Sequence, residues 1–88
     1  MQIQHQRHAG GGEFFLADEQ GCKIAELTYE FVNAHTINAN HTYVSDSLRG
    51  QGIADKLYRE LRDFVRAEQL NVVASCSYIA KKLEREKA

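Results

Sequence analysis

Residues 45–57 read SDSLRGQGIADKL, and they place two glycines, Gly50 and Gly52, where an amphipathic helix begins. Glycine disfavours a helix interior by about 0.8–1 kcal/mol relative to alanine, so two glycines at a helix start need a structural reason. One interpretation is a tight turn. The other is a backbone that approaches an anion, because the first N–H groups of a helix have no partner within it. Arg49, just before the glycines, would add a positive charge at the same place.

The helix after this loop is the clearest secondary-structure signal in the chain. Its apolar residues recur at helical spacing and are Ile53, Ala54, Leu57, Tyr58, Leu61, Phe64 and Val65. Residues 35–44 before the loop and residues 71–76 after it are expected to be strands, the second buried on both faces because it is almost continuously apolar. The three segments predict a right-handed strand–helix–strand unit with its two strands parallel.

The segments before this unit predict antiparallel strands. Residues 13–17 form one expected strand, and residues 25–31 alternate apolar and polar side chains as a half-buried strand does. The same alternation in residues 35–44 predicts one shared face, formed by Ile37, Ala39, His41 and Tyr43. Residues 1–12 are polar and end in three glycines, which predicts either a short lead-in strand or a flexible arm.

A short final helix from about Tyr78 to Glu86 completes the order of elements. The sequence therefore predicts a mixed α+β fold with a mostly antiparallel sheet, a strand–helix–strand unit and a short C-terminal helix. Its 88 residues make a single small domain, residues 1–88, because a chain of this size supports one hydrophobic core.

Composition narrows the classes of partner. The chain has 11 basic and 12 acidic residues, and this balance gives no strong field for nucleic acid or a membrane surface. Residues 46–88 hold nine of the basic residues, so this half is the expected place for an anionic ligand. The arginines of the long helix alternate with acids, as on a solvated helix face. We expect a monomer.

The two cysteines, Cys22 and Cys76, are too few for a disulfide framework, which favours a reduced, cytoplasmic setting. The N-terminal residues contain no apolar run that could serve as a signal peptide or anchor. His5, His8 and His35 do not form ligand spacing with either cysteine, so we expect no metal site.

The sequence Arg49-Gly50-Gln51-Gly52-Ile53-Ala54 resembles the coenzyme A pyrophosphate loop, Arg/Gln-x-x-Gly-x-Gly/Ala, of the GCN5-related N-acetyltransferases. The loop also has the matching context, between a strand and a long helix. With His41-Thr42-Tyr43-Val44 and Cys76-Ser77-Tyr78, the similarity extends over residues 13–83 and is greatest to the small, single-domain YjdJ-like branch. The chain differs from that branch in having Ala74-Ser75 where a proline usually precedes the cysteine, and in ending at Ala88 without an aromatic-acidic tail.

The resemblance implies a set of coenzyme contacts. The strand ending at Tyr43 and Val44 would hydrogen-bond the pantetheine arm through its backbone. The N–H groups that follow would hold the pyrophosphate, with Arg49 beside it. The implied loop residues are Arg49, Gly50, Gln51, Gly52, Ile53 and Ala54. Acetyl-CoA would be a co-substrate, and catalysis would consist mostly of positioning an amine against its thioester.

Three residues are candidates for catalysis. Cys76 precedes a helix N-terminus, which can lower the pKa of a thiol; it is either an acetyl acceptor, a polar group beside the coenzyme thiol or an inert core residue. Tyr78 is either a general acid for the departing thiolate or a packing residue. His41 is either a base for the amine or a structural residue.

The leading hypothesis is a coenzyme A-dependent N-acetyltransferase that moves an acetyl group from acetyl-CoA to a primary amine of a small molecule or a protein. The alternative is a non-catalytic acyl-CoA-binding or protein-interaction module on the same fold. The alternative is favoured by the absence of the tail and of an obvious acidic base.

Overall fold

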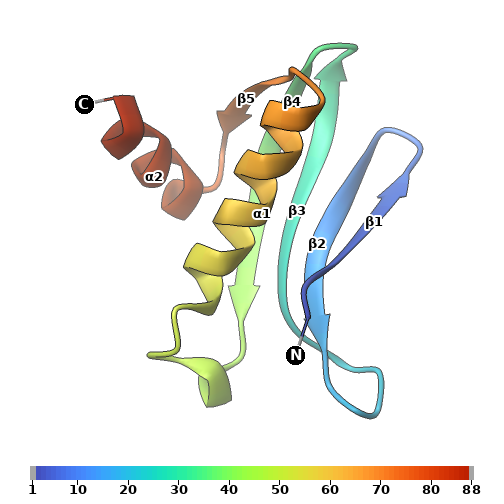
Figure 1. Ribbon diagram of the computed structural model, residues 1–88, viewed down its shortest axis with the longest axis vertical. Helices are drawn as coiled ribbons and strands as arrows, with labels where there is room; N and C mark the ends of the chain where they lie inside the picture. The colour runs from blue at the N-terminus through green and yellow to red at the C-terminus, as the bar shows by residue number, and fades with distance from the viewer. Residues whose placement is uncertain (1, 88) are drawn as a thin grey trace.

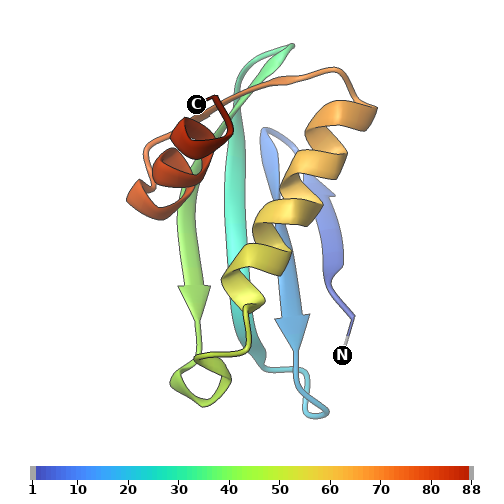
Figure 2. The ribbon, with the colours of Figure 1, turned by 60° about the vertical axis from the view of Figure 1, so that its left-hand side comes forward.

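The computed structural model describes the chain from residue 2 to residue 87 as one five-stranded sheet with two helices on one face (Figures 1 and 2). In chain order the elements are β1 (Gln4–His8), β2 (Gly11–Ala17), β3 (Lys23–Asn33), β4 (Thr36–Val44), the short 3-10 helix η1 (Asp46–Leu48), α1 (Ile53–Ala67), β5 (Asn71–Ala74) and α2 (Ser77–Lys87). The predicted α+β class is confirmed. No helix in this part of the chain is long and apolar enough to cross a membrane.

The strands lie side by side in the order in which they occur in the sequence. β1 to β4 are joined as antiparallel hairpins, whereas β4 and β5 pair in parallel through the crossover that contains α1. The predicted mixed sheet is therefore confirmed. Of the two possibilities for the N-terminal segment, residues 4–8 form a strand, which pairs with β2 along its whole length.

Alternation along β3 builds the core. Ala25, Leu27 and Tyr29 are buried against α1, which crosses the same face of the sheet. α1 presents one apolar side to them, as its helical spacing predicts. The buried core residues are Phe14, Leu16, Ala25, Leu27, Tyr29, Ile37, Ala39, Leu48, Ile53, Leu57, Tyr58, Leu61, Val65 and Ile79.

β5 is an edge strand with one open face. Val73 at its centre is 50% exposed, so the prediction that this strand is buried on both faces is wrong. The reason is that α1 and α2 both pack on the same side of the sheet, and no element among the described residues covers the other side (Figure 2).

A bulge in β4 reverses the alternation of that strand. Tyr29 of β3 pairs with Ala39, while Thr28, the residue before it, pairs with His41. Asn40 is therefore an extra residue, and its side chain accepts a hydrogen bond from the hydroxyl of Thr28 on the open face. Such an insertion moves every following side chain to the opposite face.

The side chains after the bulge are consequently arranged differently from the prediction. Thr42 and Val44 pair with buried residues of β3 and share the helix-covered face. His41 and Tyr43 pair with residues of the open face, and both are exposed. The prediction that they lie on the same face as Ile37 is wrong.

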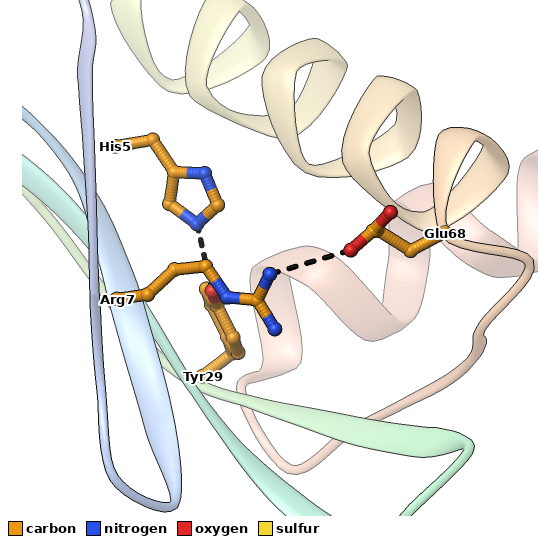
Figure 3. A network of polar contacts seen from close by, with 4 residues as sticks. All are labelled: His5, Arg7, Tyr29 and Glu68. Atoms are coloured by element: carbon orange, nitrogen blue, oxygen red, sulfur yellow. Dashed lines mark hydrogen bonds and ion pairs between the residues drawn. The ribbon is translucent and has the colours of Figure 1, made fainter.

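Aromatic and polar contacts hold β1 against the C-terminal half of α1; the polar contacts are drawn in Figure 3. The Nε2 atom of His5 lies 2.7 Å from the hydroxyl of Tyr29. The His5 ring stacks on Phe14 at 4.1 Å and meets Phe64 of α1 edge-on at 4.7 Å. The His5 ring thus packs against the edge of the core through these contacts, although every residue of β1, His5 included, is exposed.

This packing makes stability depend on pH. Burial, with a smaller contribution from the charge of Arg7, lowers the pKa of His5 below its ordinary value of 6.5. The unfolded chain therefore binds a proton at His5 more readily than the folded chain does. The contribution of neutral His5 to the free energy of unfolding is fully present above about pH 6.5, and it is lost as the pH falls through the folded-state pKa. We expect the melting temperature to fall between about pH 7.5 and about pH 5.5, and the slope to be smaller in His5→Phe, which stacks but cannot titrate. Equal slopes in calorimetry would contradict this assignment.

Candidate functional site

The loop before α1 leaves the start of that helix open. Gly52 is the N-cap residue with φ of 70°, and no side chain hydrogen-bonds the helix start. Gly50 has φ of 81°, also in the left-handed region that favours glycine. A Cβ atom at either glycine would meet nothing within 4 Å. The left-handed backbone conformation of the loop therefore accounts for both glycines. The first N–H groups of α1, at the positive end of the helix dipole, face open space.

Local contacts hold this loop in place. Ser45 caps η1 by accepting a hydrogen bond from the N–H of Ser47, and Leu48 at the end of η1 is buried in the core. Arg49 pairs with Asp46 at 3.0 Å, and both side chains are largely exposed. Because this pair is exposed, its net free energy is small, and Arg49 is available to an anion at the loop.

A cavity of about 280 Å³ opens beside the loop. It is bounded by the end of β4, the start of α1 and the first turn of α2, which brings together segments more than 20 residues apart in sequence. Its lining residues are Val44, Leu48, Arg49, Gly50, Gly52, Ile53, Ala54, Asp55 and Tyr78. Six of the residues that the sequence assigns to the coenzyme thus line one cavity, together with Tyr78.

β4 and β5 separate above this cavity. Their pairing ends at Ala39 and Ala74, and β4 continues to Val44 with no strand along that edge among the described residues. The N–H groups of Ser75 and Cys76 both donate to the carbonyl of Ala39, each at 3.2 Å. The two strands therefore form a fork whose branches are residues 40–44 and residues 75–76.

A side-chain contact that the sequence analysis missed closes this fork on the open face. The Oδ1 atom of Asn38 accepts the N–H of Ser75 at 2.9 Å, and its Nδ2 atom donates to the Ser75 hydroxyl at 3.2 Å. The same Nδ2 atom lies 3.4 Å from the carboxylate of Glu30. Asn38 is thus a positioning residue for the segment that leads into α2.

Cys76 lies at the fork, directly before the first residue of α2. Its carbonyl accepts the N–H of Ala80 at 2.9 Å, and its sulfur lies 3.4 Å from the hydroxyl of Thr42. Burial on its own would raise the pKa of the Cys76 thiol. Hydrogen bonds from the Thr42 hydroxyl and from the backbone at Ile79 and Tyr78 outweigh burial, and the pKa is lowered. Thr42 could be found only by recognising the bulge, since unbroken alternation places it on the open face.

Removal of the Thr42 hydroxyl tests this arrangement. We expect Thr42→Val to raise the pKa of Cys76, because the near-isosteric side chain cannot donate to the thiolate. The pH dependence of alkylation by iodoacetamide measures this, in a Cys22→Ser background that removes the exposed second thiol. Thr36→Val, at the other end of β4 where that strand pairs with Asn71, is the matched control. An alkylation curve that Thr42→Val leaves in place would contradict the assigned contact.

The remaining predicted residues lie apart from this cluster. His41 and Tyr43 expose their side chains on the open face of the sheet, although the backbone of Tyr43 belongs to the free edge of the fork. Gln51 lines a different cavity, which lies between α1 and the N-terminal strands. Within residues 2–87, no three His, Cys, Asp or Glu side chains gather as a metal-binding group.

The sequence profile of the GCN5-related N-acetyl-transferase family matches residues 13–88. The Protein NATD1 of Xenopus tropicalis is 44% identical over 82 residues, covering 92% of this chain and 72% of the frog protein. The human Protein NATD1 is 35% identical over 82 residues, covering 92% of this chain and 70% of the human protein.

Solved structures give the same result. The solution structure of a GCN5-like protein from Staphylococcus aureus is 36% identical and superposes with a TM-score of 0.74, covering 96% of this chain and 80% of that one. An acetyltransferase from Elizabethkingia anophelis with acetyl-CoA bound has a TM-score of 0.66 at 13% identity, covering 90% of this chain and 54% of that one, which shows a shared fold. The open helix start, the fork of β4 and β5 and these matches lead to one conclusion: the chain belongs to the GCN5-related N-acetyltransferase family.

Proposed function

We propose that this protein is an acetyl-CoA-dependent N-acetyltransferase that acetylates a primary amine. The observation that carries the proposal is the uncapped N-terminus of α1 behind Gly50 and Gly52, at a cavity that leads to the fork. Helix N-termini of this kind bind phosphate groups through backbone N–H groups and the helix dipole. The bound acetyl-CoA of the Elizabethkingia enzyme, which shares this fold, supports the choice of ligand.

Different residues would bind the different parts of acetyl-CoA. The N–H groups of residues 50–54 donate to the pyrophosphate, except that of Gln51, which donates to the carbonyl of Leu48 at 3.3 Å. Arg49 exchanges its exposed Asp46 partner for the pyrophosphate. The free backbone edge at Tyr43 and Val44 hydrogen-bonds the pantetheine arm, as a strand would. Tyr78, at the opposite wall, limits the width of the cavity.

Acetyl-CoA supplies an activated thioester carbonyl. The amine nitrogen attacks that carbon, the C–N bond forms, and the C–S bond breaks with its electron pair on sulfur, which then takes a proton. We assign this proton to the Cys76 thiol, which lies at the fork beside Thr42, or to the Tyr78 hydroxyl, whose residue lines the cavity. Thr42 and the start of α2 stabilise the thiolate that Cys76 becomes.

His41 has a different part in this proposal. Its exposed side chain lies on the open face, on the strand branch opposite Cys76. An amine that approaches the fork from this face passes His41, to which we assign the acceptance of its proton. The coenzyme and the acceptor would thus enter from opposite faces of the sheet.

The second candidate is a non-catalytic acyl-CoA-binding or protein-interaction module. One observation favours it: among the described residues, Asp55 is the only one with a carboxylate that lines the loop cavity, and it pairs with Lys82 at 2.8 Å and with Arg59 at 3.0 Å. These cations hold the pKa of Asp55 below its ordinary value, through the Lys82 hydrogen bond above all, so Asp55 is a weak base.

Two measurements separate the candidates. Titration with acetyl-CoA, followed by amide chemical shifts, is expected to move the signals of residues 50–54 first; no movement at about millimolar ligand would reject both candidates. A panel of primary amines, including a polyamine and a lysine peptide, is then assayed for release of free coenzyme A thiol. Binding without turnover on the whole panel would leave the binding module as the answer.

A further inference from the structure

A third cavity, of about 290 Å³, lies in the groove between α1 and α2. Its lining residues are Asp55, Tyr58, Arg59, Lys82, Arg85 and Glu86. The groove shares Asp55 with the loop cavity, and ion pairs of Lys82 with Asp55 and of Arg62 with Glu86 hold the two helices together across it. The groove is therefore held in shape by contacts between the two helices, and it lies beside the proposed coenzyme site.

The groove contains a buried hydrogen-bond donor without a partner. Tyr58 is 4% exposed, and its hydroxyl has no hydrogen-bond partner among the described residues. Burial raises the pKa of Tyr58 to about 12, with a further contribution from neighbouring Glu86, so the hydroxyl keeps its proton. The Nε atom of Arg62 already has an acceptor, the carboxylate of Glu86 at 2.9 Å. Buried unpartnered donors are rare, and the Tyr58 hydroxyl calls for an acceptor.

The charge of the groove fits an anionic acceptor. Three cations line it against two carboxylates. Arg59 and Lys82 both pair with Asp55, whereas Arg85 forms no ion pair within residues 2–87 and is exposed. The guanidinium of Arg85 therefore offers its planar set of donors to a ligand, in the geometry that favours phosphate oxygens.

We propose that the groove between α1 and α2 is a binding site for a phosphate group, held by the Tyr58 hydroxyl, Lys82 and Arg85. Two sources share this chemistry: the 3′-phosphate of coenzyme A bound at the neighbouring loop, and a free phosphorylated small molecule. The first source rests on the proposed function, whereas the second does not. In the absence of phosphate, the negative charge of Glu86 acts on the Tyr58 hydroxyl and helps to raise its pKa.

Three titrations of the full chain, followed by amide shifts, distinguish the sources. The probes are inorganic phosphate, coenzyme A and dephospho-coenzyme A, which lacks only the 3′-phosphate. If the groove holds that phosphate, coenzyme A binds about tenfold more tightly than its dephospho form, the value of one charge-assisted hydrogen bond. If inorganic phosphate shifts Tyr58, Lys82 and Arg85 while both coenzymes bind equally, the free source is supported.

Two variants are expected to change the affinity of the groove for phosphate in opposite directions. Arg85→Gln should weaken phosphate binding about tenfold, and Glu86→Gln should strengthen it by removing a competing negative charge. Tyr58→Phe should also weaken phosphate binding. Its melting temperature should be equal to or higher than that of the wild type, since the removed hydroxyl has no hydrogen-bond partner among the described residues. Lys81→Gln, on an exposed part of α2 outside the groove, is the control for general charge effects.

Each outcome has one meaning. Shifts at residues 50–54 with none in the groove, and equal affinity for both coenzymes, overturn the phosphate site and leave the proposed function in place. Phosphate shifts in the groove without any coenzyme response at residues 50–54 support the site and reject the proposed function. Equal losses in Arg85→Gln and Lys81→Gln would show a long-range charge effect and overturn the site.

Discussion

Gly52→Ala is expected to weaken acetyl-CoA binding about 100-fold while the fold remains intact, because about two charge-assisted hydrogen bonds to the pyrophosphate would be lost. The new Cβ meets nothing within 4 Å in the protein itself, so the substitution creates no internal clash. It fills the space in front of the open N–H groups of α1, which the proposal assigns to the ligand. Calorimetric titration with acetyl-CoA measures the change.

The backbone cost of this substitution needs its own control. At φ of 70°, alanine costs about 1–2 kcal/mol relative to glycine, and this strain alone could loosen the loop. Gly21→Ala imposes the same kind of strain, since Gly21 has φ of 83° and open space around it in an exposed turn. Similar losses of melting temperature with a loss of affinity only in Gly52→Ala would support the loop as the pyrophosphate site. Unchanged affinity in Gly52→Ala would remove it.

The sequence was most informative where a segment has a clear period. α1 and β3 could be predicted because their apolar residues recur at 3.6 and 2 residues, and the helix start is marked by Gly52. The parallel pairing of β4 and β5 follows from the crossover between them. The loop cavity could be anticipated from the resemblance of residues 49–54, since that motif is local.

The sequence was least informative where a tertiary contact overrides a local pattern. The bulge at Asn40 depends on pairing with β3 and on the Thr28 hydrogen bond, and no residue type in residues 35–44 requires it. One extra residue moved His41 to the open face and brought Thr42 to Cys76. The exposure of Val73 likewise depends on which face the helices cover, which an apolar run does not encode.

Cys76→Ala is expected to lower kcat about 100-fold or more with little change in acetyl-CoA affinity, because the departing thiolate loses its proton donor. The expectation rests on the position of the thiol at the fork, 3.4 Å from Thr42, and on its lowered pKa. Single-turnover transfer to an amine found active in the acceptor panel measures the chemical step. Cys22→Ala, which removes the exposed thiol in the turn between β2 and β3, is the control for thiol loss.

The size and form of the loss distinguish the roles of this cysteine. If Cys76 accepts the acetyl group, acetyl-CoA alone acetylates it, and mass spectrometry of the wild-type protein without amine finds the adduct. If it acts as an acid, no adduct forms, and Thr42→Val lowers kcat in the same direction because a thiol of higher pKa donates less readily. If Cys76→Ala transfers acetyl at the wild-type rate, the thiol is structural and Tyr78, at the wall of the same cavity, is the remaining donor. A Tyr78→Phe variant that then retains full activity would leave proton transfer to solvent and catalysis to positioning alone.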